Sequence, residues 1–227
     1  MGKTILTPKQ FSFLELAAKE PQITKRFYLT GGTALSEFYF KHRLSADLGL
    51  FSERQVNPAV IDSFLKSISG RLGVAKVIKE NVFGLYTYKF QYNDGDILKV
   101  DFNYYPFPKI EKGIYFGKLE VSSVYDIAVN KLHTIGMKPR ARDYIDLYFI
   151  FKKSEYEAEK YLNRMRIDSQ AKFDWLLEVK YLVTAFLRVK DFSKDEFPKM
   201  LVNFDPKDME RFFLSEAKKL EKGIFIS

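Results

Sequence analysis

The sequence contains no cysteine, which excludes a disulfide framework and every metal site built on thiolates. A cysteine-free chain is most simply intracellular, and we expect a cytoplasmic protein. The two histidines, His42 and His133, are too few and too isolated for a histidine metal site or a catalytic triad. No apolar run approaches the ~20 residues that cross a bilayer, and the N-terminus lacks the apolar core of a signal peptide. We therefore expect no membrane partner.

The bulk composition is that of an ordinary globular protein, with 46% hydrophobic and 29% charged residues. At 227 residues the chain suits one large domain or two small ones. The 37 Lys and Arg exceed the 29 Asp and Glu, giving a net charge of +8. This excess favours polyanionic partners, nucleic acid above all, although many basic proteins bind none.

The apolar period changes near residue 120. Before that point it predicts helices at 7–20, 33–40 and 57–69 and strands at 27–30, 47–51, 73–79, 83–92, 97–105 and 114–116. After it, the period of 3.6 predicts helices at 122–135, 142–151, 154–164, 170–189, 194–202 and 206–220. The sequence therefore predicts an α+β protein, with an α/β domain over residues 1–120 and an all-α helical domain over residues 121–227.

A double glycine, Gly31 and Gly32, stands between a predicted strand and a predicted helix. Glycines in this place let backbone N–H groups approach a phosphate closely. A tight turn that needs positive φ is the commoner explanation for two glycines alone.

Asp47 opens the next predicted strand, and position 49, which shares its face of the strand, is glycine. Two acids at this spacing would converge on a Mg²⁺ ion, but Gly49 leaves only one. The alternative is that Asp47 caps the strand or pairs with Arg43.

Asp101 is an acid inside an otherwise apolar strand. A buried carboxylate is costly unless it meets a cation or a metal ion. If its strand neighbours that of Asp47, the two acids can share one ion. A solvent-facing position on an edge strand is the alternative.

Asp143 and Asp146 stand three residues apart on one predicted helix and so share a face. Lys131, Arg140 and Arg142 can hold the phosphates of a nucleotide or a nucleic acid. The alternative is a salt-bridged helix pair, in which Lys131 is the internal partner of one or both aspartates.

Together these segments resemble the nucleotidyltransferase superfamily, and specifically its AbiEii toxin type. The residues that carry the resemblance, in the family's order, lie at 29–35, 42–51, 100–102, 131 and 142–147. The resemblance implies a nucleotidyltransferase-type mixed β-sheet followed by a helical domain. It also implies a Mg²⁺-dependent transfer of a nucleotidyl group from an NTP to an acceptor. In toxin members of type IV toxin-antitoxin or abortive infection systems the acceptor is often an RNA, such as a tRNA, and a cognate antitoxin neutralises the enzyme.

The resemblance also implies the site residues. The two metal ligands are Asp47 and Asp101, which are catalytic together with Lys131, Asp143 and Asp146. Lys131 contacts the nucleotide or the transition state. The nucleotide-binding residues are Gly31, Gly32, Thr33, Arg43 and Ser45.

The departure from the family pattern is Gly49, where the family usually carries the second acid of an Asp-x-Asp pair. Loss of one ligand should impair a transferase strongly. Three explanations stay open: a natural pseudoenzyme, a substitution that tames a toxic protein, or a site that works with one acid fewer. The alternative function is a catalytically inactive protein of the same fold that binds nucleotide, RNA or a partner.

Overall fold

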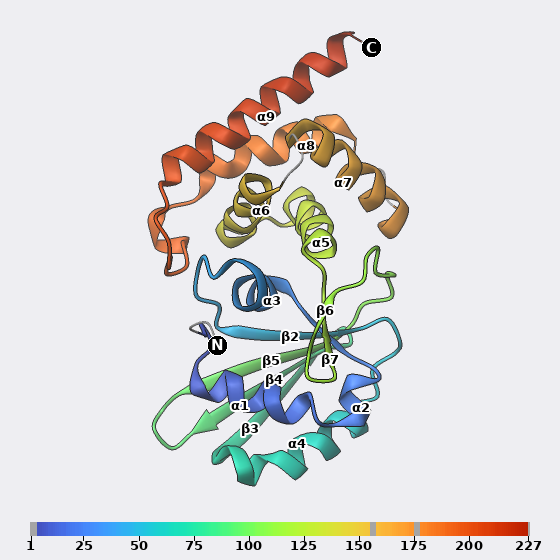
Figure 1. Ribbon diagram of the computed structural model, residues 1–227, viewed down its shortest axis with the longest axis vertical. Coiled ribbons are helices and arrows are strands. Elements are labelled where there is room, and N and C mark those ends of the chain that lie inside the picture. Colours follow the sequence, from blue (N-terminus) through green and yellow to red (C-terminus); the bar gives the residue numbers. More distant parts are fainter. Residues whose placement is uncertain (1–3, 155–157, 175–177, 227) are drawn as a thin grey trace. The chain divides into compact units, whose positions relative to one another are not determined.

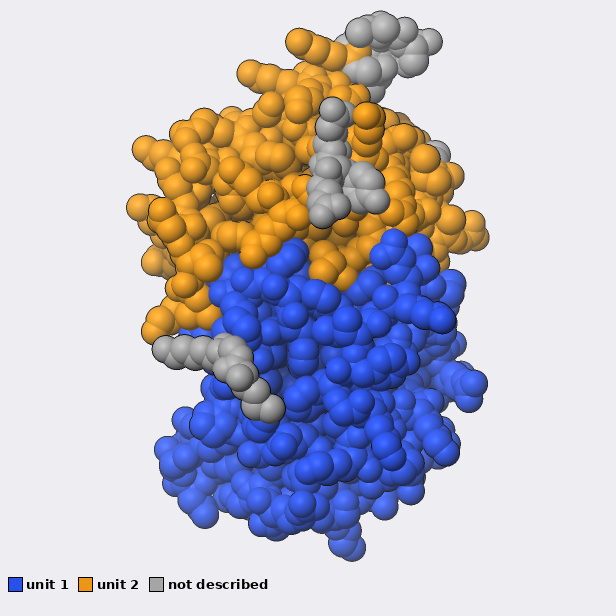
Figure 2. Space-filling model, in the orientation of Figure 1, with its two compact units in different colours: residues 1–123 blue, residues 124–227 orange. Residues whose placement is uncertain are grey.

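The computed structural model describes residues 4–154, 158–174 and 178–226 and divides into two compact units, 1–123 and 124–227 (Figures 1 and 2). The sequence placed the division after residue 120. The predicted α+β class is confirmed, because unit 1 carries a mixed sheet and unit 2 is helical. None of the helices in the described ranges has both the length and the apolar character that crossing a bilayer requires.

The sheet of unit 1 has the strand order β3-β4-β5-β2-β1-β7-β6 within the described residues. Its strands are β1 (Tyr28–Thr30), β2 (Asp47–Ser52), β3 (Val74–Val82), β4 (Leu85–Tyr92), β5 (Ile97–Tyr104), β6 (Ile114–Phe116) and β7 (Leu119–Val121). β2 runs parallel to β5 and antiparallel to β1, which runs parallel to β7. The sequence analysis did not predict β7, which pairs with β6 around Gly117 at φ +59.

The alternation of side chains along β2 and β5 separates a core face from a polar face. Leu48 and Leu50 of β2 are fully buried, as is Val100 of β5. Because successive side chains of a strand point to opposite faces, Asp47 and Asp101 lie together on the other, partly exposed face. The period of two therefore places both acids on the same side of the sheet.

The helical segments of unit 1 are α1 (Pro8–Ala17), α2 (Pro21–Thr24), α3 (Gly31–Leu35), the π-helical turn η1 (Ser36–Phe40) and α4 (Pro58–Leu72). Figure 1 shows α1 and α4 on one side of the sheet and α3 on the other. The core of unit 1 includes Phe13 of α1, whose ring meets Phe64 of α4 and Phe90 of β4 edge-on at 6.0 and 5.6 Å. Such edge-to-face contacts are the preferred geometry of aromatic pairs.

Unit 2 is built from α5 (Val124–Met137), α6 (Ala141–Lys153), α7 (Ala158–Phe173), α8 (Val179–Leu187), the 3₁₀ turns η2 (Arg188–Asp191) and η3 (Lys194–Glu196), and α9 (Pro206–Ile226). Its core contains the rings of Tyr144, Phe186 and Phe213, with Phe213 lying 5.2 Å from each of the other two. The Tyr144 hydroxyl donates to the carbonyl oxygen of Ala185 at 2.5 Å, which satisfies a polar atom inside this core.

Two predicted helices of the C-terminal part are wrong. The helix expected over 194–202 is only the turn η3, because Pro198 disfavours helical geometry at Phe197, which is extended at φ −80 and ψ 137. The single helix expected over 170–189 is two, since α7 ends at Phe173 before the left-handed Asp174 and α8 begins at Val179. The parts of the predicted helices at 155–157 and 175–177 lie outside the described residues.

Candidate active site

The two predicted metal ligands lie on adjacent strands of unit 1. In the parallel pairing of β2 with β5, Asp47 is opposite Lys99 and Gly49 is opposite Asp101. The Lys99 Nζ lies 3.5 Å from Asp47 Oδ2 and 3.1 Å from Asp101 Oδ2. The strand of Asp101 is thus the neighbour of the Asp47 strand, and the two carboxylates converge on one cation, which is a side chain of the protein.

The cluster is partly open to solvent and electrostatically coupled. The side chains of Asp47 and Asp101 are 34% and 19% exposed. Asp101 Oδ1 also accepts a 2.6 Å hydrogen bond from the Thr87 hydroxyl of β4. Burial works to lower the pKa of Lys99, but its hydrogen bond to Asp101 and the charges of both aspartates raise that pKa overall, so the ammonium is charged at neutral pH.

The backbone at position 49 does not require a glycine. Its φ lies outside the left-handed region, and an added Cβ would lie 3.4 Å from the Thr30 carbonyl oxygen and 3.6 Å from Phe51 Cε1. These are ordinary van der Waals distances, so the strand has room for the Cβ of an aspartate at this position.

With a glycine at position 49, few side chains near Asp47 and Asp101 are potential metal ligands. Within the ranges that the structure describes, no three histidine, aspartate or glutamate side chains are grouped so that they can hold a metal ion. Two carboxylates still suit one Mg²⁺ ion, because this cation keeps several waters and takes its remaining ligands from substrate phosphates. Asp47 and Asp101 therefore fit a single Mg²⁺, whose other ligands would be water and substrate phosphates.

The double glycine forms the turn from β1 into α3, and each glycine has its own reason. Gly31 has a φ of +79, which only glycine adopts readily. At Gly32 an added Cβ would lie 2.2 Å from Arg43 Nη2. Gly32 thus leaves room for the guanidinium group of Arg43, which is buried and donates to the Leu44 carbonyl oxygen at 3.0 Å.

Thr33 and Ser45 fix the backbone where β2 begins. The Thr33 hydroxyl lies 2.8 Å from Ser45 Oγ and 2.5 Å from the Asp47 carbonyl oxygen. From α1, the buried Gln10 amide donates to the carbonyl oxygens of Ser45 and Ala46 at 2.8 and 2.9 Å. The predicted nucleotide-binding residues therefore include two whose side-chain contacts hold Asp47 in place.

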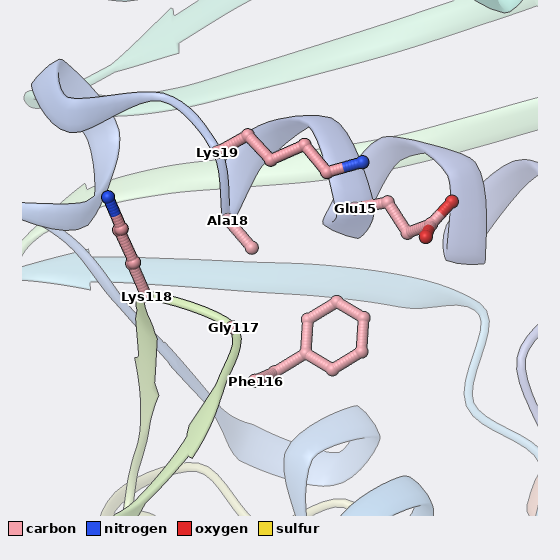
Figure 3. Close-up of a pocket in the computed structure, with 6 residues that line it drawn as sticks. All are labelled: Glu15, Ala18, Lys19, Phe116, Gly117 and Lys118. Carbon is pink, nitrogen blue, oxygen red and sulfur yellow. The ribbon is translucent and has the colours of Figure 1, made fainter.

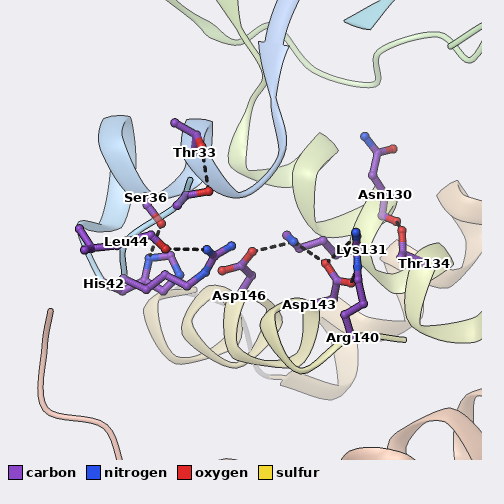
Figure 4. A network of polar contacts seen from close by, with 12 residues as sticks. Thr33, Ser36, His42, Leu44, Asn130, Lys131, Thr134, Arg140, Asp143 and Asp146 are labelled. Atoms are coloured by element: carbon purple, nitrogen blue, oxygen red, sulfur yellow. Dashed lines mark hydrogen bonds and ion pairs between the residues drawn. The ribbon is translucent and has the colours of Figure 1, made fainter. Parts of the chain in front are cut away.

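The remaining predicted catalytic residues form a second cluster, in unit 2 (Figure 4). Lys131 of α5 places its Nζ 2.8 Å from Asp143 Oδ1 and 2.6 Å from Asp146 Oδ2, both on α6. The side chains of these aspartates are 1% and 0% exposed, and that of Lys131 is 9% exposed. Arg140 Nε adds a contact of 2.9 Å to Asp143 Oδ2 from the surface.

This geometry is the salt-bridged helix pair, which the sequence analysis gave as the alternative to phosphate binding by Lys131. Burial works to raise the pKa of Asp143, but the charges of Lys131 and Arg140 outweigh it and lower that pKa. The aspartate is therefore ionised at neutral pH. Arg142, the other cation that the sequence singled out, is exposed on α6.

Lys99 and Thr87 contact the predicted metal ligands, and the sequence analysis named neither of them. The signal for Lys99 was present, because it stands two residues before Asp101 in a strand and so shares its face. Thr87 is opposite Asp101 in the β4–β5 hairpin, a register that depends on where the turn between these strands falls.

A pocket of about 430 Å³ in unit 1 lies away from the predicted site residues (Figure 3). It is lined by the end of α1, the two residues that follow it and the β6–β7 hairpin, through Glu15, Ala18, Lys19, Phe116, Gly117 and Lys118. None of these residues belongs to the carboxylate cluster or to the glycine turn.

Comparison with known proteins gives a family and a fold. The family model described as nucleotidyl transferase AbiEii toxin, type IV TA system, matches residues 13–221. No curated protein matches the chain. A solved structure assigned as a nucleotidyltransferase from H. pylori is 18% identical, with a TM-score of 0.56 over 96% of this chain and 97% of its own. MenT4, a nucleotidyltransferase toxin of Mycobacterium tuberculosis, is 15% identical, with a TM-score of 0.52 over 95% of this chain and 86% of its own.

Proposed function

Because the chain belongs to the AbiEii nucleotidyl transferase toxin family, we propose that it is a Mg²⁺-dependent nucleotidyltransferase of a type IV toxin-antitoxin system. It transfers a nucleotidyl group from an NTP to an acceptor, with RNA, including tRNA, as the favoured class. It acts in the cytoplasm and is neutralised by a cognate antitoxin protein.

The observation that carries this proposal is the convergence of Asp47 and Asp101 on one cation from adjacent parallel strands. The two carboxylates would hold Mg²⁺ together with the phosphates of the NTP. When bound, the ion supplies charge neutralisation at the phosphates and lowers the pKa of an attacking hydroxyl. The acceptor hydroxyl gives up its proton to water and attacks the α-phosphorus in line, and the bond from this phosphorus to the oxygen of the leaving pyrophosphate breaks.

The other residues of the proposed site bind and orient. Gly31 and Gly32 let the backbone approach the phosphates, while Thr33 and Ser45 fix the segment that presents Asp47. The buried guanidinium of Arg43 braces this turn against Gly32 and contributes positive charge.

The proposed role of Lys131 is to stabilise negative charge on the nucleotide or in the transition state. Asp143 and Asp146 hold its ammonium in one position, so little reorganisation is needed when the nucleotide binds. This makes the two aspartates positioning residues for Lys131.

The test is the exchange of Gly49 for aspartate, which supplies the acid that the family pattern expects. Gly49→Asp should raise Mg²⁺-dependent transfer of label from an NTP mixture to cellular RNA. Gly49→Asn is the matched control, since it adds a side chain of the same size without the charge and should leave transfer at the level of the parent. If neither the parent nor Gly49→Asp labels any RNA or protein, the enzyme proposal is wrong.

The second candidate is a catalytically inactive protein that binds nucleotide, RNA or a partner through the same fold. The glycine at position 49 favours it, because the cluster then offers two carboxylates only. Calorimetry with NTP and Mg²⁺ separates the two candidates. Tight binding by the parent without turnover in any acceptor mixture supports the inactive protein.

A further inference from the structure

The cation between the two aspartates of unit 1 belongs to the chain itself. The Lys99 ammonium lies within 3.5 Å of Asp47 and 3.1 Å of Asp101. A metal ion that is shared by these carboxylates must approach the same two side chains. Lys99 and a divalent cation are therefore alternatives, or close and mutually repelling neighbours, at one place on the sheet.

The position of Lys99 follows from the strand register. Lys99 lies directly opposite Asp47 on β2 and two residues before Asp101 on its own strand. On the other side, its register partner on β4 is Lys89, whose ammonium is engaged with Glu80 at 2.6 Å. The two opposite lysines therefore engage different acids, Lys89 the glutamate of β3 and Lys99 the aspartates of β2 and β5.

The charge of the cluster is consequently low. Two carboxylates and one ammonium sum to −1, whereas the same cluster with an aspartate at position 49 would sum to −2. Removal of the ammonium alone would also give −2. Affinity for a divalent cation rises with the negative charge of its ligands, so Gly49 and Lys99 act in the same direction.

We propose that Lys99 is a resident counter-ion of the carboxylate cluster, which competes with the divalent cation and sets how tightly the chain binds it. This inference rests on the proposed function, because it takes Asp47 and Asp101 as the metal ligands. Lys99 is a positioning residue: it holds the carboxylates together when the metal is absent and moves aside when the metal enters. The chain then binds free divalent cations weakly.

The test measures metal binding and not activity. Free Mn²⁺ is titrated with the full-length chain and followed by its electron paramagnetic resonance signal, for the parent, Lys99→Gln and Lys99→Arg. Lys99→Gln should bind Mn²⁺ at least about tenfold more tightly, because the Coulomb repulsion between the lysine charge and a divalent ion is twice that for a monovalent ion. Lys99→Arg keeps the charge and should stay near the parent.

Lys89→Gln is the matched control. It removes the same charge from the register partner on β4, whose ammonium pairs with Glu80 and not with the aspartates. Its Mn²⁺ affinity should stay within about twofold of the parent, since an exposed charge outside the cluster is screened. Lys99→Met, which also removes the charge, serves in place of Lys99→Gln if that variant does not fold.

Equal Mn²⁺ affinity of the parent and Lys99→Gln would overturn the inference, and so would an equal gain in Lys89→Gln. If Gly49→Asp binds Mn²⁺ and transfers label while Lys99→Gln binds no better than the parent, only the role of Lys99 is wrong. If even the double variant Gly49→Asp/Lys99→Gln binds no Mn²⁺, the inference is wrong and the Mg²⁺ dependence in the proposed function is wrong with it.

Discussion

Replacement of Lys131 by methionine tests whether the cluster of unit 2 stabilises the protein. The Lys131 ammonium contacts Asp143 and Asp146, whose side chains are 1% and 0% exposed. Removing one partner of a buried ion pair costs about 3–5 kcal/mol, because a carboxylate stays buried without that compensation. Asp143 keeps Arg140 at 2.9 Å, so we expect the lower end, about 3 kcal/mol.

The assay is thermal unfolding followed by circular dichroism. For a chain of this size, about 3 kcal/mol corresponds to a fall in Tm of about 6–12 °C. The pH dependence gives a second check. A carboxyl group with a lowered folded pKa contributes stability above its unfolded pKa of about 3.9 and loses it as the pH falls through the folded value. The difference in stability between parent and Lys131→Met should therefore close below about pH 4.

Lys172→Met is the control that separates a loss of stability from a loss of NTP binding. Lys172 of α7 pairs with Asp126 of α5 at 3.0 Å, and their side chains are 3% and 1% exposed, so its loss should destabilise to a similar degree. At a temperature well below both transitions, Lys131→Met should lose NTP affinity and Lys172→Met should keep it. A Tm of Lys131→Met within about 1 °C of the parent would refute the reasoning about the buried network.

Further outcomes are expected in unit 1 and on α5. Gly32→Ala should lower the free energy of unfolding by about 1–3 kcal/mol in urea titrations, because its Cβ meets the Arg43 guanidinium. Gly31→Ala should cost about 1–2 kcal/mol through backbone strain alone, since φ is +79 and the space around it is open. Thr7→Ala breaks the capping box of α1 and should cost about 0.5–2 kcal/mol in the same titration. Burial lowers the pKa of His133, so the unfolded chain takes up more protons below about pH 6.5 and stability falls there. His133→Phe should flatten this decline between the urea midpoints at pH 7 and about pH 5.5.

The elements around the carboxylates were predictable because their signals are local. Alternation along 47–51 indicated that Asp47 faces away from the core, the apolar run at 97–105 gave the strand of Asp101, and the double glycine gave the turn into α3. The parallel pairing of β2 with β5 was not predictable in this way, because it joins residues separated by α4 and the β3–β4 hairpin. Only the cost of a buried carboxylate indicated that Asp101 needed a cation nearby.

For the cluster of Lys131, Asp143 and Asp146, the spacing of residues in the sequence did not decide the function. Asp143 and Asp146 were correctly placed on one helix face, and Lys131 was named both as a phosphate ligand and as their internal partner. The distances show the internal pairing. Its existence depends on how α5 packs against α6, which no local pattern fixes. A role towards a nucleotide stays a prediction.

Gly49 lies in the interior of strand β2, where glycine is unfavourable. Glycine weakens a strand interior by about 0.5–1 kcal/mol relative to alanine, and a positive φ or a close approach usually explains its presence there. Gly49 has neither, since its φ is ordinary and an added Cβ meets only van der Waals neighbours. The fold therefore does not explain why position 49 lacks an acid. The consequence of the glycine is that the carboxylate cluster carries one negative charge less. Lys99 changes that charge in the same direction. Under the proposed function we expect the metal ion to enter together with the triphosphate, whose own negative charge offsets what the two carboxylates lack.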